Sequence, residues 1–282
     1  AVLGQYWGYV GTSPAKAPFF NFGVMLASYI HYGAAFPVGS SQALSNAFVD
    51  AFQSHGGEAR MGCGVDKIIV EDGRAVGVVT GHGDEIRARW IVSNADPITT
   101  SRKLIGDEHL PRRFFEELRY KELSPSTVNV YLGLNRSNEQ LGLRDHEIFV
   151  NDNDDLDGHA ESMTRIGPPS EVVLTSYNAA FPDFSPPGTS VVVLTTLSRG
   201  EPWLSVSPDH YRDVKTMMAE SMLDKAERVV PGLRETAEVI EVSTPLTNMR
   251  YSGNPGGAIY GFAASQWHNM ALTPDHRGPV DG

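Results

Sequence analysis

One continuous block, residues 36–97, constrains the fold of this chain more than any other part of the sequence. After Gly39, a serine can cap a helix whose apolar residues recur on one face, and Gly57 follows the end of that helix. An Asp-Gly pair, Asp72-Gly73, then predicts a tight hairpin turn between β-branched segments. A strand is expected to start at 58–62, and the strands of a meander are expected at 65–70, 75–80 and 85–92. The block therefore predicts a helix followed by a three-stranded meander.

The sequence after this block predicts a second group of strands covered by helices. Helices are expected at 97–105, 111–121 and 208–229, and strands at 126–134, 147–150, 171–177, 190–196 and 236–243. The residues from 244 onward are rich in glycine and proline and are expected to form a loop. Together these elements predict an α+β fold with mixed or antiparallel sheets, arranged in two lobes.

An apolar segment, residues 17–32, is the nearest approach to a membrane span. It is too short to cross a bilayer, and Asn21, Ser28 and His31 interrupt it. Two interpretations stay open, because a helix of this kind is either buried in a core or forms a wall of an apolar ligand cavity.

Composition and charge exclude some classes of function. The chain has 282 residues, of which 41% are hydrophobic, so it can bury a sizeable core. Because its net charge is -11, we expect that the chain does not bind the phosphates of nucleic acid electrostatically. The single cysteine, Cys63, excludes an internal disulfide, and the amino-terminal residues lack a secretory signal pattern. We expect a cytoplasmic or peripheral membrane protein and leave its oligomeric state open.

Three other kinds of site, a calcium loop, a zinc site and a nucleophile for covalent hydrolysis, have little support in the sequence. The run Asn153–Gly158 has acidic residues at calcium-loop spacing, but Thr164 stands where such a loop requires a bidentate glutamate, so an acidic surface loop is favoured. The histidines have no paired spacing for zinc, and no metal site is expected. Covalent hydrolysis is disfavoured, because there is no Gly-x-Ser-x-Gly elbow and Cys63 lacks a motif partner.

Four blocks, in order, resemble the phytoene-desaturase-like flavoprotein oxidoreductases. The block Phe36–Leu44 is similar to the Tyr/Phe-Pro-x-Gly-Gly-x-x-x-Leu segment that lies next to the flavin in that family, with Ser40 in place of the second glycine. The segment Gly57–Ile68 resembles the strand pair whose valine backbone contacts the adenine, which corresponds to Val65. Residues 93–97 (Ser-Asn-Ala-Asp-Pro) resemble the return near the cofactor, and 254–261 resemble the glycine loop that borders the catalytic pocket.

The resemblance implies a bound FAD and a set of contact residues. The implied cofactor-binding residues are Gly39, Ser40, Val65, Asn94, Ala95, Asp96, Gly256 and Gly257. The implied substrate-pocket residues are Phe36, Tyr251 and Tyr260, and no catalytic residue is assigned. Each block also has a purely structural interpretation, since the glycines can serve turns, Asn94 and Asp96 can cap the next helix, and the tyrosines can pack in a core.

One departure from the family is serious. A dinucleotide fold needs Gly-x-Gly-x-x-Gly between a strand and a helix, and Gly4, Gly8 and Gly11 have the wrong spacing. The carboxyl-terminal segment that closes over the flavin in the family is also not recognised. We therefore expect an internal part of a longer enzyme that does not hold FAD tightly by itself. Residues 36–105 and 244–282 are expected to be a remnant of the FAD-binding domain, and 1–35 and 106–243 the substrate-binding domain.

The function implied by the resemblance is hydride transfer between flavin and an apolar isoprenoid such as a carotenoid or retinoid. The cofactor carries that chemistry, while the protein orients the substrate and excludes water. The direction of the reaction stays open. The alternative is a noncatalytic lipid-binding or interaction module derived from the same fold.

Overall fold

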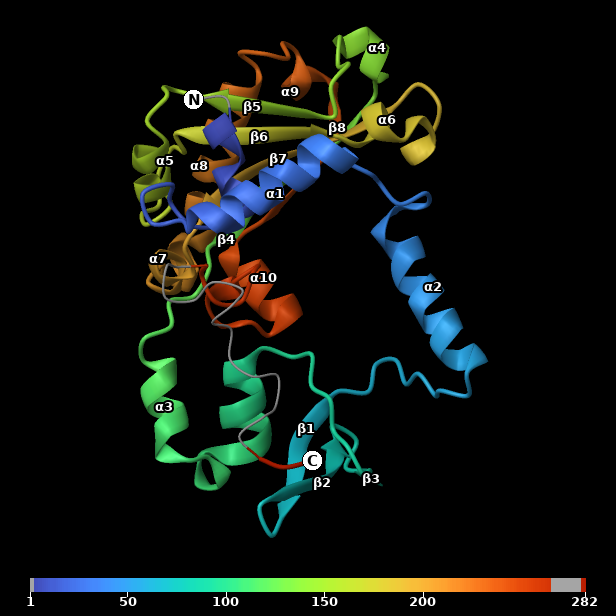
Figure 1. Ribbon diagram of the computed structural model, residues 1–282. Coiled ribbons are helices and arrows are strands. Elements are labelled where there is room, and N and C mark those ends of the chain that lie inside the picture. Colours follow the sequence, from blue (N-terminus) through green and yellow to red (C-terminus); the bar gives the residue numbers. More distant parts are fainter. Residues whose placement is uncertain (1–2, 265–279) are drawn as a thin grey trace.

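The computed structural model describes residues 3–264 and 280–282, and they form two antiparallel sheets with helices around them (Figure 1). The larger sheet has the strand order β5-β6-β7-β4-β8, and the smaller has the order β1-β2-β3. The strands are β1 (Val65–Glu71), β2 (Arg74–Thr80), β3 (Glu85–Arg87), β4 (Ser126–Leu134), β5 (Glu147–Asn151), β6 (Glu171–Ser176), β7 (Ser190–Ser198) and β8 (Ala237–Ser243). The predicted α+β class, with antiparallel sheets in two lobes, is confirmed.

The helices lie between and around these strands. The α-helices are α1 (Phe19–Tyr32), α2 (Ser40–Ser54), α3 (Arg112–Leu118), α4 (Asn138–Leu141), α5 (Leu156–Ser162), α6 (Tyr177–Ala180), α7 (Gly200–Leu204), α8 (Pro208–Ala226), α9 (Leu233–Thr236) and α10 (Pro245–Ser252). The other helical segments are η1 (Leu3–Tyr9), η2 (Thr99–Gly106), η3 (Asp107–His109), η4 (Pro182–Phe184) and η5 (Pro255–Gly257).

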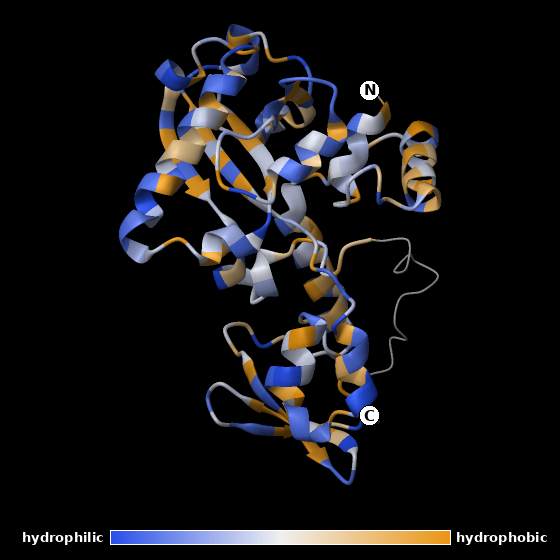
Figure 2. Cartoon of the chain, turned by 90° about the vertical axis from the view of Figure 1, so that its left-hand side faces the viewer, coloured by the Kyte–Doolittle hydropathy of each residue, from blue (hydrophilic) through white to orange (hydrophobic). Residues whose placement is uncertain are grey.

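One face of the larger sheet forms the main hydrophobic core. Alternate residues of β4 point to this face and are fully buried: Val128, Val130 and Leu132. Helix α8 lies behind the sheet (Figure 1) and packs Met222 and Leu223 against them. The hydrophobic residues concentrated in these strands are seen in Figure 2. Burial of this apolar stripe is the main source of stability for the lobe.

The opposite face of the same sheet carries the remaining alternate residues. Its register places five side chains in one row across β5, β6, β7, β4 and β8, namely Glu147, Thr175, Val193, Tyr131 and Glu241. Helix α1 crosses this face in Figure 1, and η1 also lies over it, since Tyr6 contacts Phe149 of β5. This face is the part of the larger lobe that is not occupied by the main core.

The smaller lobe is the predicted meander, packed on η2 and α3. Its core includes Ile68 and Ala75 from the sheet and Leu104 and Ile105 from η2. The hairpin turn is made by Asp72-Gly73, both at positive φ, as the Asp-Gly pair predicts. The chain returns to this lobe at its end, because Asp281 accepts a hydrogen bond from the backbone N–H of Ala75.

Several sequence predictions about elements are wrong. Residues 58–62 form no strand, and β3 ends at Arg87 rather than at residue 92. A helix, α10, follows Thr244 where a loop was expected. Thr244 and Thr247 form a reciprocal capping box at its start, which outweighs the glycine and proline signals nearby.

Helix α1 is helical as expected, and of the two interpretations left open for it, burial in a core is wrong while a wall of an apolar cavity stays a prediction. None of its residues is buried, and Phe19, Ile30 and Tyr32 are largely exposed. The sequence predicts a helix from its apolar residues, but it does not specify which surface covers them. The division into 36–105 with 244–282 and 1–35 with 106–243 stays a prediction, and residues 265–279 of it lie outside the described residues.

Candidate functional site

The turn at residues 93–97 is built around Asp96. Its buried carboxylate accepts hydrogen bonds from the backbone N–H groups of Ile98 at 2.8 Å and Thr99 at 3.1 Å. Asp96 therefore caps the helical segment that begins there, as the structural interpretation of this block expects. Asn94 and Ala95 are exposed beside it.

The glycine loop at 254–261 packs backbone against backbone. A Cβ on Gly257 would stand 2.5 Å from the carbonyl oxygen of Pro245, and one on Gly200 would stand 2.2 Å from that of Gly256. These approaches explain why glycine occupies positions 200 and 257, independently of any ligand. The loop also reaches the 93–99 segment, because Thr99 Oγ1 donates to the carbonyl oxygen of Gly253 at 3.4 Å. The contact therefore joins residues that directly adjoin two of the predicted blocks, 93–97 and 254–261, and the assignment of these blocks to the cofactor stays a prediction.

An open pocket of about 390 Å³ lies beside this loop. It is lined by Asn248, Tyr251, Ser252, Asn254, Gly257, Ala258 and Ile259. Tyr251 thus lines an open pocket, and its assignment to the substrate pocket stays a prediction. Tyr260 does not line it, and its hydroxyl instead donates to the carbonyl oxygen of Gly8 at 3.3 Å. Tyr260 therefore connects the late loop to the amino-terminal segment.

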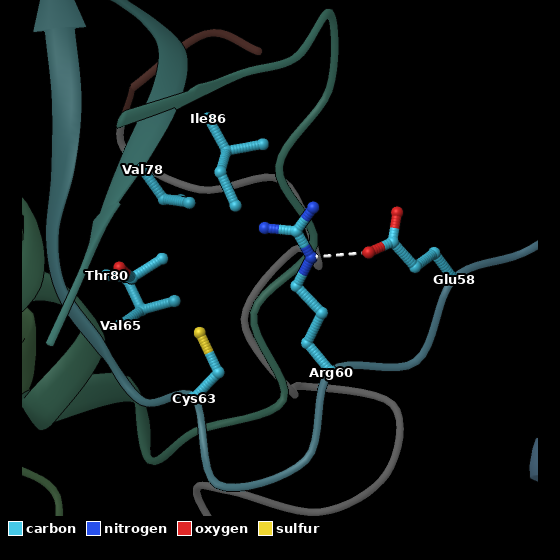
Figure 3. A pocket seen from close by; sticks show the side chains of 7 residues that line it. All are labelled: Glu58, Arg60, Cys63, Val65, Val78, Thr80 and Ile86. Carbon is cyan, nitrogen blue, oxygen red and sulfur yellow. Dashed lines mark hydrogen bonds and ion pairs between the residues drawn. The ribbon is translucent and has the colours of Figure 1, made fainter. Parts of the chain in front are cut away.

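A second pocket, of about 370 Å³, adjoins Val65 at the start of β1 (Figure 3). It is lined by Glu58, Arg60, Cys63, Val65, Val78, Thr80 and Ile86. The Arg60 guanidinium donates to Glu58 at 2.7 Å and holds the pKa of that carboxyl below its usual value. Val65, Val78 and Ile86 form an apolar wall opposite Arg60. The pocket thus has an apolar wall on one side, with Thr80 beside Val65, and the Arg60 guanidinium on the other.

The Gly39-Ser40 turn stands apart from both pockets. Both residues have positive φ, 80° for Gly39 and 74° for Ser40, so Ser40 occupies a conformation that favours glycine. Helix α2 begins there and extends away from both sheets (Figure 1). Within the described residues, no hydrogen bond or ion pair joins α2 to either sheet. The structure does not bring Gly39 and Ser40 to the other predicted blocks.

Phe36 lies in a group of aromatic rings at one end of the larger sheet. Its ring centroid is 5.9 Å from that of Tyr177, 6.2 Å from that of His146 and 6.4 Å from that of Phe184. Tyr177 and Phe184 are stacked with centroids 4.8 Å apart. Phe36 is thus placed in an aromatic environment, as expected for a pocket residue. The sequence analysis did not single out Tyr177 or Phe184 as site residues.

A second aromatic group lies on the same face and surrounds the start of β5. The ring of Tyr6 is 5.3 Å from that of Tyr29, 5.8 Å from that of Phe149 and 5.9 Å from that of Tyr9. The Tyr9 hydroxyl donates a hydrogen bond to Glu147. Burial, together with this carboxylate, raises the pKa of Tyr9 far above its usual value. Tyr9 is therefore held in its protonated form, in which its hydroxyl donates to Glu147.

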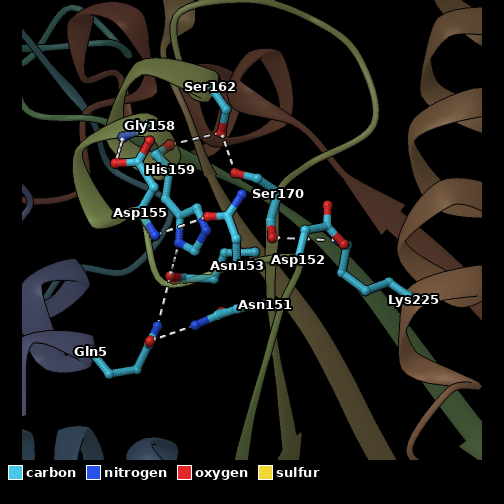
Figure 4. A network of polar contacts seen from close by, with 11 residues as sticks. Gln5, Asn151, Asp152, Asn153, Asp155, Gly158, His159, Ser162, Ser170 and Lys225 are labelled. Atoms are coloured by element: carbon cyan, nitrogen blue, oxygen red, sulfur yellow. Dashed lines mark hydrogen bonds and ion pairs between the residues drawn. The ribbon is translucent and has the colours of Figure 1, made fainter. Parts of the chain in front are cut away.

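A polar network anchors the amino-terminal segment under this second group (Figure 4). Gln5 donates to Glu171 at 2.7 Å and accepts from Asn151 at 2.5 Å. His159 Nδ1 lies 3.3 Å from the same Glu171 carboxylate. Burial raises the pKa of Glu171. Because i and i+3 residues of a 3₁₀ helix share a side, fixing Gln5 places Tyr6 and Tyr9 together on the sheet face.

The alternation of residues along two strands is a signal in the sequence for this face. The alternation in β4 and β5 assigns Tyr131, Glu147 and Phe149 to the side opposite the core. The contact with Tyr9 spans 138 residues of sequence and could not be read from spacing. The face as a whole offers aromatic contact surface, and Glu147 is the carboxylate on it that Tyr9 contacts. Among the described residues, no group of three potential metal ligands is found.

The residues present fit part of a flavin dinucleotide site. The pocket beside Val65 suits a nucleobase, and the 93–99 segment meets the late glycine loop at Gly253. Within residues 3–264 and 280–282 there is no Gly-x-Gly-x-x-Gly loop that could hold the phosphates. The described part of the chain therefore has residues that fit the border of such a site, but it does not contain the phosphate-binding loop.

Comparisons with known proteins agree on one family. Residues 19–236 match the family model described as flavin containing amine oxidoreductase. A chloroplastic prolycopene isomerase of Daucus carota is 28% identical over 95% of this chain and 42% of its own length. An all-trans-retinol 13,14-reductase of Danio rerio is 24% identical over 93% of this chain and 46% of its own length. A lycopene-forming phytoene desaturase of Pseudescherichia vulneris is 28% identical over 76% of this chain and 43% of its own length.

A solved structure shows the same fold. A putrescine oxidase variant superposes with a TM-score of 0.54 and 14% identity, covering 86% of this chain and 45% of that one. The chain spans less than half of the length of each of these proteins. In the described part, no helix is both long and apolar enough to span a membrane.

Proposed function

The chain belongs to the flavin containing amine oxidoreductase family, and from this membership we propose that it is part of an FAD-dependent oxidoreductase. Its substrate is proposed to be an apolar isoprenoid such as a carotenoid or retinoid, which exchanges a hydride with the flavin. Sequence relatives named for prolycopene, phytoene and retinol support this substrate class. FAD, when bound, supplies the hydride chemistry.

The single observation that carries the proposal is the aromatic face of the larger sheet. Two groups of rings meet at β5: Tyr6 packs on Phe149 of this strand, and Phe36 packs on Tyr177 and on His146, the residue before the strand. Tyr131 stands on that face and is 43% exposed, so its ring is available to a ligand. A flat polyene gains dispersion contact and loses its hydration against such rings.

The residues of this chain have binding and orienting roles in the proposed enzyme. The aromatic rings would fix the plane of a polyene and exclude water from it. The cofactor contacts are proposed at Val65, at Asn94–Asp96, at Gly256-Gly257 and at Gly39-Ser40. The pocket beside Val65 and the contact between Thr99 and Gly253 support the first three of these.

The experiment uses the whole enzyme of which this chain is part, purified with its flavin bound. Oxidised enzyme is mixed anaerobically with phytoene, and reduced enzyme with all-trans-retinol, while flavin absorbance is followed. A change of the flavin spectrum that depends on one of these polyenes is expected. Tyr131→Ala should weaken binding of that polyene about tenfold, since a buried aromatic contact is lost. Tyr120→Ala, on a ring that is exposed elsewhere, should leave it unchanged.

Two other results would contradict this function. Polyene binding without any flavin change in either state would favour the alternative, a noncatalytic lipid-binding module. Turnover of other substrates with no polyene binding would overturn the substrate class.

Peripheral membrane contact is a separate proposal. The exposed Phe19, Ile30 and Tyr32 of α1 support it, because apolar helix faces insert at the lipid surface. The net charge of -11 predicts a preference for neutral over anionic vesicles. Flotation with phosphatidylcholine vesicles, compared between wild type and Ile30→Lys, tests it. Equal flotation of wild type and Ile30→Lys would contradict the insertion of α1 at the lipid surface.

A further inference from the structure

We propose that Glu147, held by Tyr9, accepts a hydrogen bond from a hydroxyl group on an otherwise apolar polyene, so that the site selects polyene alcohols over polyene hydrocarbons. This inference rests on the proposed function, because it assumes that a polyene lies on the aromatic face. It adds a residue that decides which polyene binds.

The position of Glu147 supports this role. It opens β5 on the aromatic face and shares a row across the sheet with Thr175, Val193 and Tyr131. It lies beside both aromatic groups, because Tyr9 of one group donates to it and because it directly follows His146, whose ring is 6.2 Å from that of Phe36 and 6.1 Å from that of Tyr177 in the other group. A ligand that runs from one group to the other would therefore pass this carboxylate.

The hydrogen bonding of Glu147 leaves room for a ligand. Tyr9 donates to one carboxylate oxygen, Oε2. Within residues 3–264 and 280–282, no hydrogen-bond donor contacts the other oxygen, Oε1. An ionised carboxylate can accept about four hydrogen bonds. A hydrocarbon laid against it would remove water and give nothing back, whereas a hydroxyl group would donate to Oε1.

The geometry around Tyr9 makes Glu147 a fixed acceptor. Tyr9 stacks on Tyr6 with an interplanar angle of 21°, and η1, which carries both rings, is anchored through Gln5 to Glu171 and Asn151. A preorganised acceptor discriminates more sharply than a mobile one, because it does not turn away when the ligand lacks a donor. The selectivity should therefore depend on Glu147 itself.

Glu241 provides a matched control. It is a glutamate on the same face of the same sheet, directly opposite Tyr131 on the edge strand β8, and it is exposed. Within the described residues, the Glu241 side chain has no hydrogen bond or ion pair. A change there alters the charge of the face as much as a change at Glu147 does, without touching the proposed acceptor.

The experiment measures binding of two ligands that differ only in one group. The probes are all-trans-retinol and the hydrocarbon in which a hydrogen atom replaces its hydroxyl group, titrated into the flavin-bound protein with tryptophan emission as the signal. Wild type is expected to bind the alcohol about tenfold more tightly. Glu147→Leu should abolish that preference by weakening only the alcohol. Glu147→Gln, which keeps the shape and a neutral acceptor, should retain about threefold. Glu241→Gln should keep the full tenfold.

Four other results would overturn the inference, and they differ in whether the proposed function also fails. Equal binding of both probes by wild type, or an unchanged preference in Glu147→Leu, would overturn the inference while leaving the proposed function standing. Tighter binding of retinylamine than of retinol would make Glu147 a cation site and also overturn it. Failure of both polyenes to bind would overturn the inference together with the proposed substrate class.

Discussion

Gly200 and Gly256 lie so close together that a Cβ built on Gly200 would stand 2.2 Å from the carbonyl oxygen of Gly256. Through this contact, the glycine loop at 254–261 packs against the start of α7 in the larger lobe. Real Cβ atoms do not approach a carbonyl oxygen so closely, and the neighbouring atoms are backbone, which cannot turn aside.

Gly200→Ala should therefore destabilise the fold, by about 2 kcal/mol, through overpacking. Gly167→Ala is the control, because a Cβ there meets nothing within 4 Å and the backbone is not at positive φ. The free energy of unfolding from urea titration distinguishes the two variants. Equal stability of both would show that the loop moves away from α7 without cost.

Asp96→Ala should lower stability by about 1 kcal/mol, because two backbone N–H groups at the start of the helical segment lose their acceptor. Asn94→Ala, two residues earlier and exposed, should change it by much less. Thermal unfolding of the flavin-free protein gives both values. If the two substitutions cost the same, Asp96 does not act as the cap.

Ser40→Gly should stabilise the chain by about 1 kcal/mol, since Ser40 has a φ of 74° that only glycine adopts without strain. Ser41→Gly, one residue into α2, should do the opposite, because glycine weakens a helix interior. The difference in unfolding midpoint between the two variants tests the assignment. A loss of stability in Ser40→Gly would contradict the left-handed conformation.

The ion pair of Asp152 with Lys225 and Arg228 should contribute stability that depends on pH. The hydrogen bond from Lys225, and then that from Arg228, lowers the pKa of Asp152 below its ordinary 3.8. A depressed pKa means that the contribution is complete above the unfolded value and is lost as the pH falls through the folded value.

Asp152→Asn should cost about 2 kcal/mol near pH 7, because it leaves the buried ammonium of Lys225 without its counter-charge. The cost should shrink toward zero in strong acid, where wild type has also lost the charge. Asp154→Asn, in the same acidic run, is the control, since the Asp154 side chain has no ion pair among the described residues. Urea titrations from pH 7 down to about pH 1.5 measure both variants. A cost that does not vary with pH would exclude the ion pair as its source.

Local pattern predicted much of the framework correctly. The strand expected at 126–134 has the bounds of β4, Ser126–Leu134, and the Asp72-Gly73 turn lies where its conformational preference puts it. These features follow from neighbours within a few residues, because side-chain period and turn geometry are local properties. Where capping competed with loop composition, as at Thr244, local reasoning was wrong.

The candidate site was only partly accessible to the same reasoning. Phe36 and Tyr251 were named from a resemblance and lie in an aromatic group and a pocket respectively, while Tyr260 connects two segments instead. Tyr9 and Glu147 were not named at all. The assignments of cofactor contacts stay predictions, although the 93–99 segment and the late loop do meet at Gly253.

The sequence by itself determined the order of the elements and which residues of each strand face the core, since both depend on short-range periodicity. It also carried the family resemblance that the comparisons confirm. Only the tertiary structure decided that Tyr9 meets Glu147 across 138 residues and that the apolar face of α1 is exposed. The physical reason is that such contacts depend on how whole elements pack in space, and packing is not a function of sequence separation.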